Sequence, residues 1–257
     1  MSKHLVSVVY ITLNAEKYLE KSLDSVKNIA QEILIVDCGS TDQTLSIAQK
    51  LKVKVISRTW EGFAAQRQFA VDSACCDWVL MLDADEVLTE SGVQMIVEAL
   101  SYPSDVSAYF LRRLSIFHDK KVLHGDWGHD RVLRLFDRRQ GKYTDNLVHE
   151  AWETCAPKKT LPGISLFHYS YKDYSELIEK MRRYAMLNAQ QLRQKGRVLR
   201  AHMPMTHAIA AFTRSYFLRL GMLDGVEGAA IAWTTALGAF MKYAIALEMQ
   251  AQDKDTS

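Results

Sequence analysis

The chain has 257 residues, of which 48% are hydrophobic and 24% charged, and its formal net charge at pH 7 is +2. This length and composition support one large domain, or one domain plus an appendage, with a real hydrophobic core. The charge is uneven, because residues 1–100 contain 9 Lys/Arg and 14 Asp/Glu whereas residues 172–219 contain 10 and 3. The basic segment is rich in Ala and Leu and carries no recognition motif, so a nucleic-acid-binding role is not expected.

Apolar segments alternate with amphipathic segments through the first third of the chain. The predicted strands are residues 6–11, 33–36, 53–56 and 78–82. Helical patterns follow the first three strands, and Asn14 is expected to cap the first helix. This alternation predicts a parallel, right-handed α/β sheet. The N-terminus shows no signal-peptide pattern, and the spacing of the four cysteines matches no zinc site, so we expect free thiols in a reducing cytosol.

The turn after the first strand, residues 12–16, contains no glycine. A dinucleotide-binding unit places Gly-x-Gly-x-x-Gly there, so a pyrophosphate is not expected on the first helix in that manner. The second strand ends in Asp37, which is well placed to contact a ribose or a base. A nucleotide-binding sheet without a glycine-rich turn needs another way to neutralise phosphate charge.

The fourth strand, residues 78–82, is apolar and is followed at once by Asp83, Asp85 and Glu86. Carboxylates beside a core are costly unless something pairs with them, and ligands of open α/β sheets bind beyond the carboxyl ends of the strands. Oxygen ligands suit Mg²⁺ or Mn²⁺ bridging to phosphate. The alternative is that these acids merely begin the next helix, where they favour its dipole.

Four segments, taken in order, resemble the signature of family-two glycosyltransferases with the GT-A fold. They are residues 8–16, 35–42, 62–68 and 82–86. Four further segments are similar to the members that add glucose to heptose in the inner core of lipopolysaccharide, the β-1,4-glucosyltransferases. They are residues 60–63, 134–136, 147–150 and 168–170. The resemblance covers about residues 5–170, and Gln68 stands where many members have Asn.

This resemblance implies an α/β fold, a GT-A-type nucleotide-binding mixed sheet flanked by helices, with a C-terminal helical extension. The expected catalytic domain is residues 1–170, the basic amphipathic helical region is 171–251, and the disordered tail is 252–257. The implied donor is a UDP-sugar, UDP-glucose by similarity, and the implied cofactor is Mg²⁺ or Mn²⁺, which stabilises the departing UDP.

The resemblance also implies roles for individual residues. Those expected to bind the nucleotide sugar are Thr12, Asn14, Glu16, Asp37, Ser40, Arg67 and Asp83. Asp85 is expected to coordinate the metal, with Asp83 and His149 as further metal ligands. Trp127 lies in a glycine-flanked loop and is expected to stack on a sugar face; the alternative is a core tryptophan under a loop.

The family is inverting, so a single base that deprotonates the acceptor hydroxyl suffices. Glu150 is the expected base and Asp130 the second candidate, while an ordinary loop acid and a packing histidine remain the alternatives for Glu150 and His149. An Asp-x-Asp strand end is also similar to the nucleophile strand of haloacid-dehalogenase-type phosphatases, with Asp83 attacking phosphate. A non-catalytic membrane-surface adaptor is the third interpretation.

The C-terminal third combines basic and apolar patterns. Residues 171–194 have helical spacing with many Lys and Arg, and residues 203–249 are rich in Ala, Leu, Ile, Phe and Met. The uncharged run at residues 228–241 is shorter than the ~20 residues that a membrane span takes, which argues against a transmembrane helix. We expect amphipathic helices on the anionic inner face of the cell membrane, a cytoplasmic peripheral location and a lipid-linked glycan acceptor. A packed helical subdomain or a homodimer interface is the alternative.

The assignment of Glu150 predicts the behaviour of one variant. Glu150→Gln should retain donor binding but lose at least about 100-fold in transfer rate, because general base catalysis typically contributes 10²–10⁴-fold. Calorimetric titration with UDP-glucose and a transfer assay measure the two quantities separately. Normal turnover by this variant would remove Glu150 from the mechanism.

Overall fold

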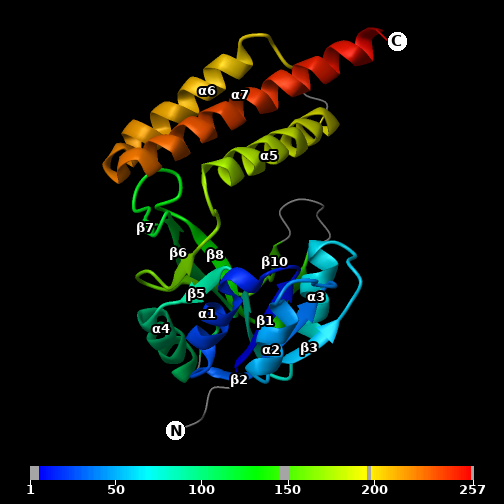
Figure 1. The fold of residues 1–257 in the computed structure, drawn as a ribbon, viewed down its shortest axis with the longest axis vertical. Coiled ribbons are helices and arrows are strands. Elements are labelled where there is room, and N and C mark those ends of the chain that lie inside the picture. Colours follow the sequence, from blue (N-terminus) through cyan, green and yellow to red (C-terminus); the bar gives the residue numbers. More distant parts are fainter. Residues whose placement is uncertain (1–5, 103, 145–150, 196–197, 256–257) are drawn as a thin grey trace. The chain divides into compact units, whose positions relative to one another are not determined.

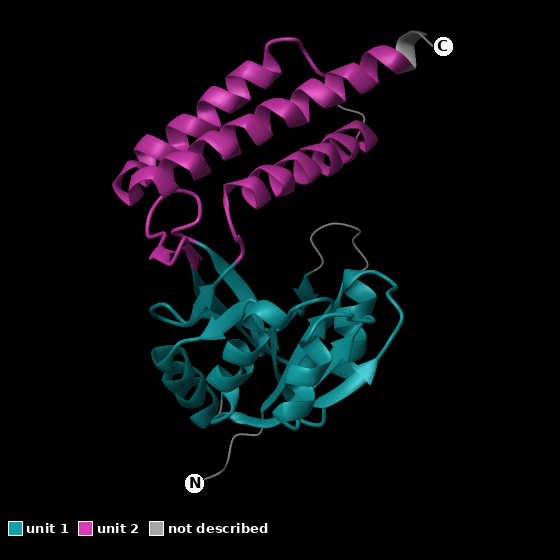
Figure 2. Cartoon of the chain, in the orientation of Figure 1, with its two compact units in different colours: residues 1–114, 130–169 teal, residues 115–129, 170–257 magenta. Residues whose placement is uncertain are grey.

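A computed structural model describes residues 6–102, 104–144, 151–195 and 198–255 (Figure 1). The chain forms two compact units, each described here by itself (Figure 2). The first contains residues 1–114 and 130–169, and the second contains residues 115–129 and 170–257.

The first unit is built on a mixed sheet. Its strands are β1 (Val6–Thr12), β2 (Ala30–Asp37), β3 (Lys54–Ser57), β4 (Trp78–Leu82), β5 (Glu86–Leu88), β6 (Ala108–Phe117), β8 (Arg131–Asp137), β11 (Lys158–Thr160) and β12 (Leu166–His168). The order is β3-β2-β1-β4-β8-β6-β12-β5, with β11 beside β6. Strands β1 to β4 pair in parallel, whereas β8 runs antiparallel to both β4 and β6. The four predicted strands are all present, and the mixed α/β class is confirmed.

Helices cover both faces of this sheet. They are α1 (Glu16–Val26), α2 (Thr44–Lys50), α3 (Phe63–Asp72) and α4 (Glu90–Ser101). Successive side chains of β1 point to opposite faces. Val8 and Tyr10 therefore pack with residues of α1, α2 and α4, whereas Val9 packs with residues of α3.

The α3 face is completed by a small hairpin of β9 (Lys142–Tyr143) and β10 (Trp152–Glu153). Trp152 stacks on Phe136 of β8, with ring centroids 4.1 Å apart and an interplanar angle of 13°. Both rings are buried, so this pair attaches the hairpin to the sheet.

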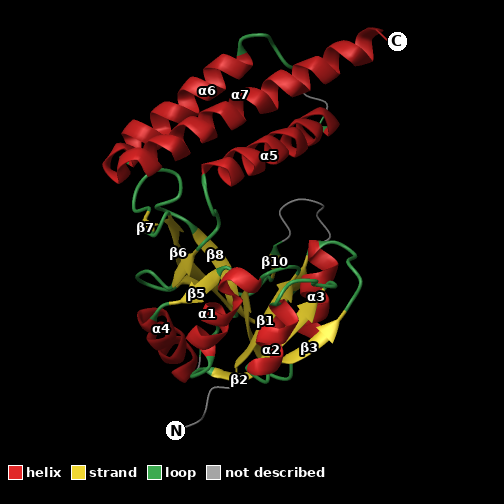
Figure 3. Cartoon of the chain, in the orientation of Figure 1, coloured by secondary structure: helices red, strands yellow, loops and turns green. Residues whose placement is uncertain are grey.

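The second unit is helical, as the red ribbons of Figure 3 show. It contains α5 (Tyr174–Gln194), α6 (Met203–Phe212), a π-helix (Thr213–Leu218), a 3₁₀-helix (Gly221–Asp224) and α7 (Gly225–Asp255), together with the short strand β7 (Lys120–Lys121). Helix α7 packs against both α5 and α6. A helical C-terminal region following the sheet was expected and is found.

Two features of the second unit differ from the expected boundaries. Residues 115–129 belong to it although they precede residue 170, because Phe117 and Val122 are buried against Leu177 of α5 and Ile231 of α7. Helix α7 also continues to Asp255, so the backbone of residues 252–255 is helical where a disordered tail was expected. Helix propagation adds a hydrogen bond per residue, which extends an existing helix readily.

One helix, spanning residues 221–252, is long and apolar enough by length and composition to cross a membrane. The 14-residue uncharged run had argued against such a helix, but the few charged residues flanking it do not break the apolar pattern.

The ring pair on the α3 face gives a test of the core. Phe136→Ala should lower the free energy of unfolding by about 3–5 kcal/mol, because it leaves a cavity between β8 and β10. Val97→Ala on α4, which removes a half-exposed side chain, should change it by less than about 0.5 kcal/mol. Urea denaturation compares the two variants, and a loss below about 1 kcal/mol for Phe136→Ala would contradict this packing.

Candidate functional site

The predicted nucleotide residues meet where β1 and β2 end side by side. Thr12 and Asp37 are partners in the parallel register, and the Thr12 hydroxyl donates to Asp37 Oδ2 at 2.7 Å. Asp37 also accepts from the backbone N–H groups of Gly39 and Ser40 and from the Ser40 hydroxyl. Burial alone would raise the pKa of Asp37, but the hydrogen bonds from Ser40 and Thr12 outweigh it and lower the pKa. The buried carboxylate therefore organises the turn after β2.

Asn14 and Glu16 connect this turn to the start of α1. Asn14 does not cap α1, whose N-cap is Ala15 without a side-chain hydrogen bond. Instead Asn14 lies at φ 52°, and its Oδ1 accepts from Thr41 N–H at 2.9 Å. Asparagine tolerates this left-handed backbone better than most residues, so its side chain is available to the neighbouring loop. Glu16 Oε2 accepts from Gln43 N–H at 2.9 Å.

Two arginines hold Asp83, the first residue after β4. Arg67 of α3 donates to Asp83 Oδ1 at 2.8 Å, and Arg134 of β8 donates to Asp83 Oδ2. Burial raises the pKa of Asp83, but the charges of Arg134 and Arg67 outweigh it and hold the pKa far below its ordinary value. Asp83 is thus an anion whose two oxygens are both engaged by guanidinium groups.

The same arginine network reaches deeper into the unit. Glu86 is fully buried, and its Oε1 accepts from both Arg134 and Arg113 at 2.8 Å. Arg113 also donates through Nε to Asp130 Oδ2 at 2.8 Å. The carboxylates of Asp83, Glu86 and Asp130 are therefore balanced by three guanidinium groups. Unpaired charges at such depth would be strongly destabilising.

Asp85 lies outside this network although it is only two residues from Asp83. Its Oδ2 is 3.6 Å from Nε2 of His168, the last residue of β12. Register brings them together, because His168 pairs with Glu86 across the antiparallel β5 and β12, and Tyr169 N–H donates to the Asp85 carbonyl at 2.9 Å. The Asp85 side chain remains 36% exposed. The sequence analysis names His168 only within the family-like segment 168–170, and it does not predict the contact of His168 with Asp85.

The chemistry of this pair fits a divalent cation. A carboxylate and an imidazole are ordinary ligands of Mn²⁺, and Mg²⁺ is commonly held by one or two protein groups plus phosphate oxygens and water. Among the described residues no cluster of three or more His, Cys, Asp or Glu could hold a metal. A site made by Asp85 and His168 would therefore need oxygens from the bound ligand.

Three further residues were predicted for the site. His149 and Glu150 fall outside the described residues. Trp127 belongs to the second unit, where it stacks on Tyr171 with ring centroids 4.9 Å apart and lines a cavity of about 180 Å³ with residues of α5 and α7. Trp127 and Tyr171 are both only partly buried.

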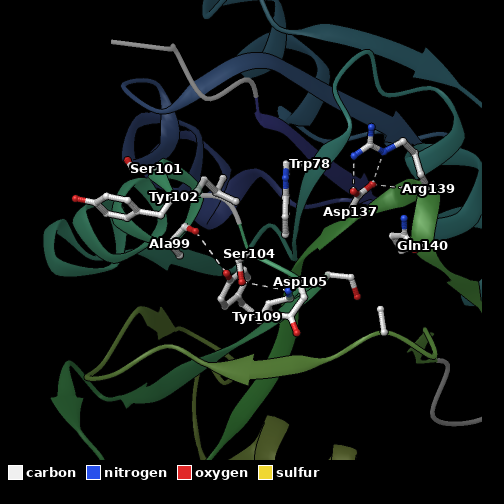
Figure 4. A pocket seen from close by; sticks show the side chains of 14 residues that line it. Trp78, Ala99, Ser101, Tyr102, Ser104, Asp105, Tyr109, Asp137, Arg139 and Gln140 are labelled. Carbon is white, nitrogen blue, oxygen red and sulfur yellow. Dashed lines mark hydrogen bonds and ion pairs between the residues drawn. The ribbon is translucent and has the colours of Figure 1, made fainter.

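A second cavity, of about 590 Å³, opens at the other end of β4 (Figure 4). Its wall includes Trp78, the first residue of β4, and the ion pair of Asp137 with Arg139. Ligands of α/β sheets bind at the carboxyl ends of the strands, so this cavity is separate from the candidate site.

Comparison with known proteins decides the family. The family model described as glycosyl transferase family 2 matches residues 7–159. The chain belongs to this family.

Similar family members include full-length relatives. An uncharacterized glycosyltransferase of Rickettsia conorii is 27% identical over 97% of this chain and 92% of its own length. The lipopolysaccharide core biosynthesis glycosyltransferase LpsC of Rhizobium meliloti is 27% identical over 96% of both chains. A crystal structure of glucosyl-3-phosphoglycerate synthase from Mycobacterium tuberculosis with Mn²⁺, UDP and product is 22% identical over 44% of each chain, with a TM-score of 0.38.

These findings confirm the family-two glycosyltransferase expected from the sequence, and one of its relatives is named for lipopolysaccharide core biosynthesis. The phosphatase interpretation is not supported. Its nucleophile would be Asp83, whose two oxygens are both taken by arginines, and three strands precede β4 in the sheet.

The arginine network in this glycosyltransferase can be tested by charge removal. Asp83→Asn should cost about 2–4 kcal/mol at pH 7, less than a fully buried pair, because the Asp83 side chain keeps 29% exposure. The pKa of Asp83 is lowered by folding, so its stabilisation is complete above the unfolded value of about 3.9 and is lost as pH falls through and below it. The difference between wild type and variant should therefore shrink below about pH 4.

Urea denaturation at a series of pH values measures this difference. Asp77→Asn is the matched control, since Asp77 pairs with Arg139 at 2.8 Å between two exposed side chains. That change should cost less than about 1 kcal/mol at every pH. Equal losses of unfolding free energy for the two substitutions at pH 7 would show that the network around Asp83 stabilises the fold no more than an exposed ion pair does.

Proposed function

We propose that this family-two glycosyltransferase transfers glucose, with inversion, from UDP-glucose to a heptose of the lipopolysaccharide core or a similar glycan acceptor. One observation carries the proposal: at the carboxyl edge of the sheet, Asp83 is held by two arginines while Asp85 stands beside His168 and keeps an exposed carboxylate. The edge thus offers both a fixed anion and an exposed carboxylate that stands beside an imidazole.

The nucleoside part of the donor would occupy the edge formed by β1 and β2. Thr12, Asn14, Glu16, Asp37 and Ser40 are brought together there by the parallel register and the linked turns. Asp37 and Ser40 fix the backbone of the turn, so that a ribose or base would meet an edge that is already ordered. Arg67 orients Asp83, so that the Asp83 carboxylate is held in place before a ligand arrives.

Asp85 and His168 would hold Mg²⁺ or Mn²⁺, with Asp83 adjacent to the ligand and His149 as a further candidate. The ion, when bound, supplies positive charge that stabilises the diphosphate of the leaving UDP. The protein contributes orientation: the backbone hydrogen bond from Tyr169 to the Asp85 carbonyl fixes the loop that carries the carboxylate.

Transfer requires a base for the acceptor hydroxyl, and Glu150 is our proposed base with Asp130 as second candidate. The base takes the hydroxyl proton as the oxygen attacks the anomeric carbon and the bond to UDP breaks on the opposite face. Asp130 Oδ2 accepts two hydrogen bonds from Arg113, an arrangement that suits a structural anion better than a proton acceptor.

The relative LpsC supports an acceptor in the lipopolysaccharide core, because its similarity extends over 96% of both chains. Such an acceptor is lipid-linked, so we also propose that the protein works at the cytoplasmic face of the membrane. Trp127, stacked on Tyr171 in the helical unit, is the proposed platform for a sugar ring. A homodimer remains a further proposal without a specific contact to support it.

Ligand-induced stabilisation tests the donor and the ion together. UDP-glucose with Mn²⁺ at about 100 times its dissociation constant should stabilise the fold by about 2.7 kcal/mol, which raises Tm by about 5–10 °C. Removing the ion with a chelator, or introducing Asp85→Asn, should abolish most of this rise. Asp24→Asn, an exposed acid on α1, is the control and should leave the rise unchanged.

The specificity arm replaces UDP-glucose by GDP-mannose and by other UDP-sugars. Equal stabilisation by all nucleotide sugars would reject UDP-glucose as donor. A rise that persists in Asp85→Asn would show that Asp85 does not hold the ion.

A further inference from the structure

The second unit exposes an unusual concentration of apolar side chains between the π-helix and α7. In residues 217–226, six of ten side chains are large, apolar and exposed: Phe217, Leu218, Leu220, Met222, Leu223 and Val226. Leu218 is 75% exposed and Val226 69%. We call this segment the apolar tip. Scattered exposed apolar residues are normal, but a contiguous group of this kind marks an interaction surface.

The acidic side chain of the same segment, Asp224, is turned away from solvent, and the exposed Arg219 is held in an ion pair. Asp224 accepts from the His124 backbone N–H at 2.7 Å and meets the His124 ring at 2.8 Å. Arg219 donates to Asp126 at 2.6 Å. Each of these partners lies in residues 118–129, within the same unit.

Glu227, the next acid along the chain, follows the same pattern. Its side chain is 7% exposed, and Lys120 donates to it at 2.9 Å. Lys120 therefore pairs with Glu227 and His124 hydrogen-bonds to Asp224, and the outer surface of the apolar tip presents no exposed carboxylate. Removing acids from a surface favours its approach to a negatively charged layer.

Apolar exposure continues from the tip along α7. Val226, Trp233, Leu237 and Met241 follow one another at intervals of seven, four and four residues, which places them on one face of the helix. Phe212, at the end of α6, packs against Trp233 with ring centroids 4.5 Å apart. Tryptophan is enriched where apolar and aqueous phases meet.

We propose that the apolar tip inserts into the lipid bilayer and anchors the protein to the membrane from one side. A bilayer fits better than a second protein copy, because a stable dimer uses roughly 20–30 residues a side, whereas the tip and the exposed face of α7 together offer nine apolar residues. Insertion from one side fits better than a span, because α7 packs against α5, whose exposed Arg182 and Arg183 would have to enter the hydrocarbon layer with it.

This inference deepens the proposed membrane location and rests on the proposed function. It also changes the expected mode of attachment. The sequence pointed to the basic side chains of α5, of which Arg182 and Arg183 are exposed. The apolar tip would instead supply most of the binding energy, with the basic residues adding affinity for anionic lipid.

Vesicle flotation of the full chain separates these modes. The probes are vesicles of phosphatidylcholine alone and of phosphatidylcholine with phosphatidylglycerol. The double variant L218D/L223D should lower partitioning into both by at least about tenfold, because each buried leucine contributes more than a factor of ten. The milder L218S/L223S pair should give a smaller loss in the same direction.

Two controls complete the design. Ile178→Asp places the same charge on an exposed apolar position of α5 and should leave partitioning unchanged. R182A/R183A should weaken binding only to the anionic vesicles. Each variant is checked by circular dichroism and by its thermal shift with UDP-glucose and Mn²⁺, which reports the donor site independently of lipid.

Three results would overturn the proposal. They are wild-type protein that floats with neither vesicle, unchanged flotation of L218D/L223D, and a homodimer in sedimentation that this double variant dissociates. Failure of the donor thermal shift with tip-dependent flotation intact would reject the proposed function and leave the membrane anchor standing.

Discussion

The pairing of three buried or half-buried carboxylates with three arginines is the constraint on which the candidate site depends. Glu86 is inaccessible to solvent, so its charge must be met inside the protein, and Arg113 and Arg134 meet it. Arg134 then engages Asp83 as well, which draws β8 to the end of β4. The three positive and three negative charges balance one another, so the end of the sheet can hold ordered charged side chains without an unpaired buried charge.

This network also separates the roles of two neighbouring acids. Asp83 is held in ion pairs, because Arg67 and Arg134 each donate to one of its oxygens. Asp85 lies beside His168, and its side chain is partly exposed to solvent. A preorganised anion next to an accessible ligand pair costs little reorganisation when a charged substrate binds. The Asp37 turn is organised in a similar way on a smaller scale, because the backbone N–H groups of Gly39 and Ser40 donate to its carboxylate.

Charged side chains of the helical unit are also paired within the unit, and this pairing affects the character of its surface. Residues 118–129 form hydrogen bonds or ion pairs with Arg219, Asp224 and Glu227, whereas the apolar side chains between these residues are exposed. Pairing of the charged side chains within the unit thus leaves a largely apolar surface, although the local sequence contains both charged and apolar residues.

The local sequence pattern predicted strands β1 to β4, the helices between them and the acidic residues after β4. These features could be predicted because hydrophobic periodicity and strand ends depend on a few adjacent residues. The motifs at the strand ends also indicated the family. The local pattern correctly grouped Thr12, Asp37 and Ser40, since parallel strands end together. It did not determine which acid stays accessible, because Arg134 lies 51 residues from Asp83 and β12 meets β5 only through register. It predicted amphipathic helices in the C-terminal third but not which apolar side chains are exposed, because the burial of Asp224 and Glu227 depends on partners about 100 residues away. Contacts between residues far apart in the chain decided these points, because charge balance and exposure depend on the folded environment.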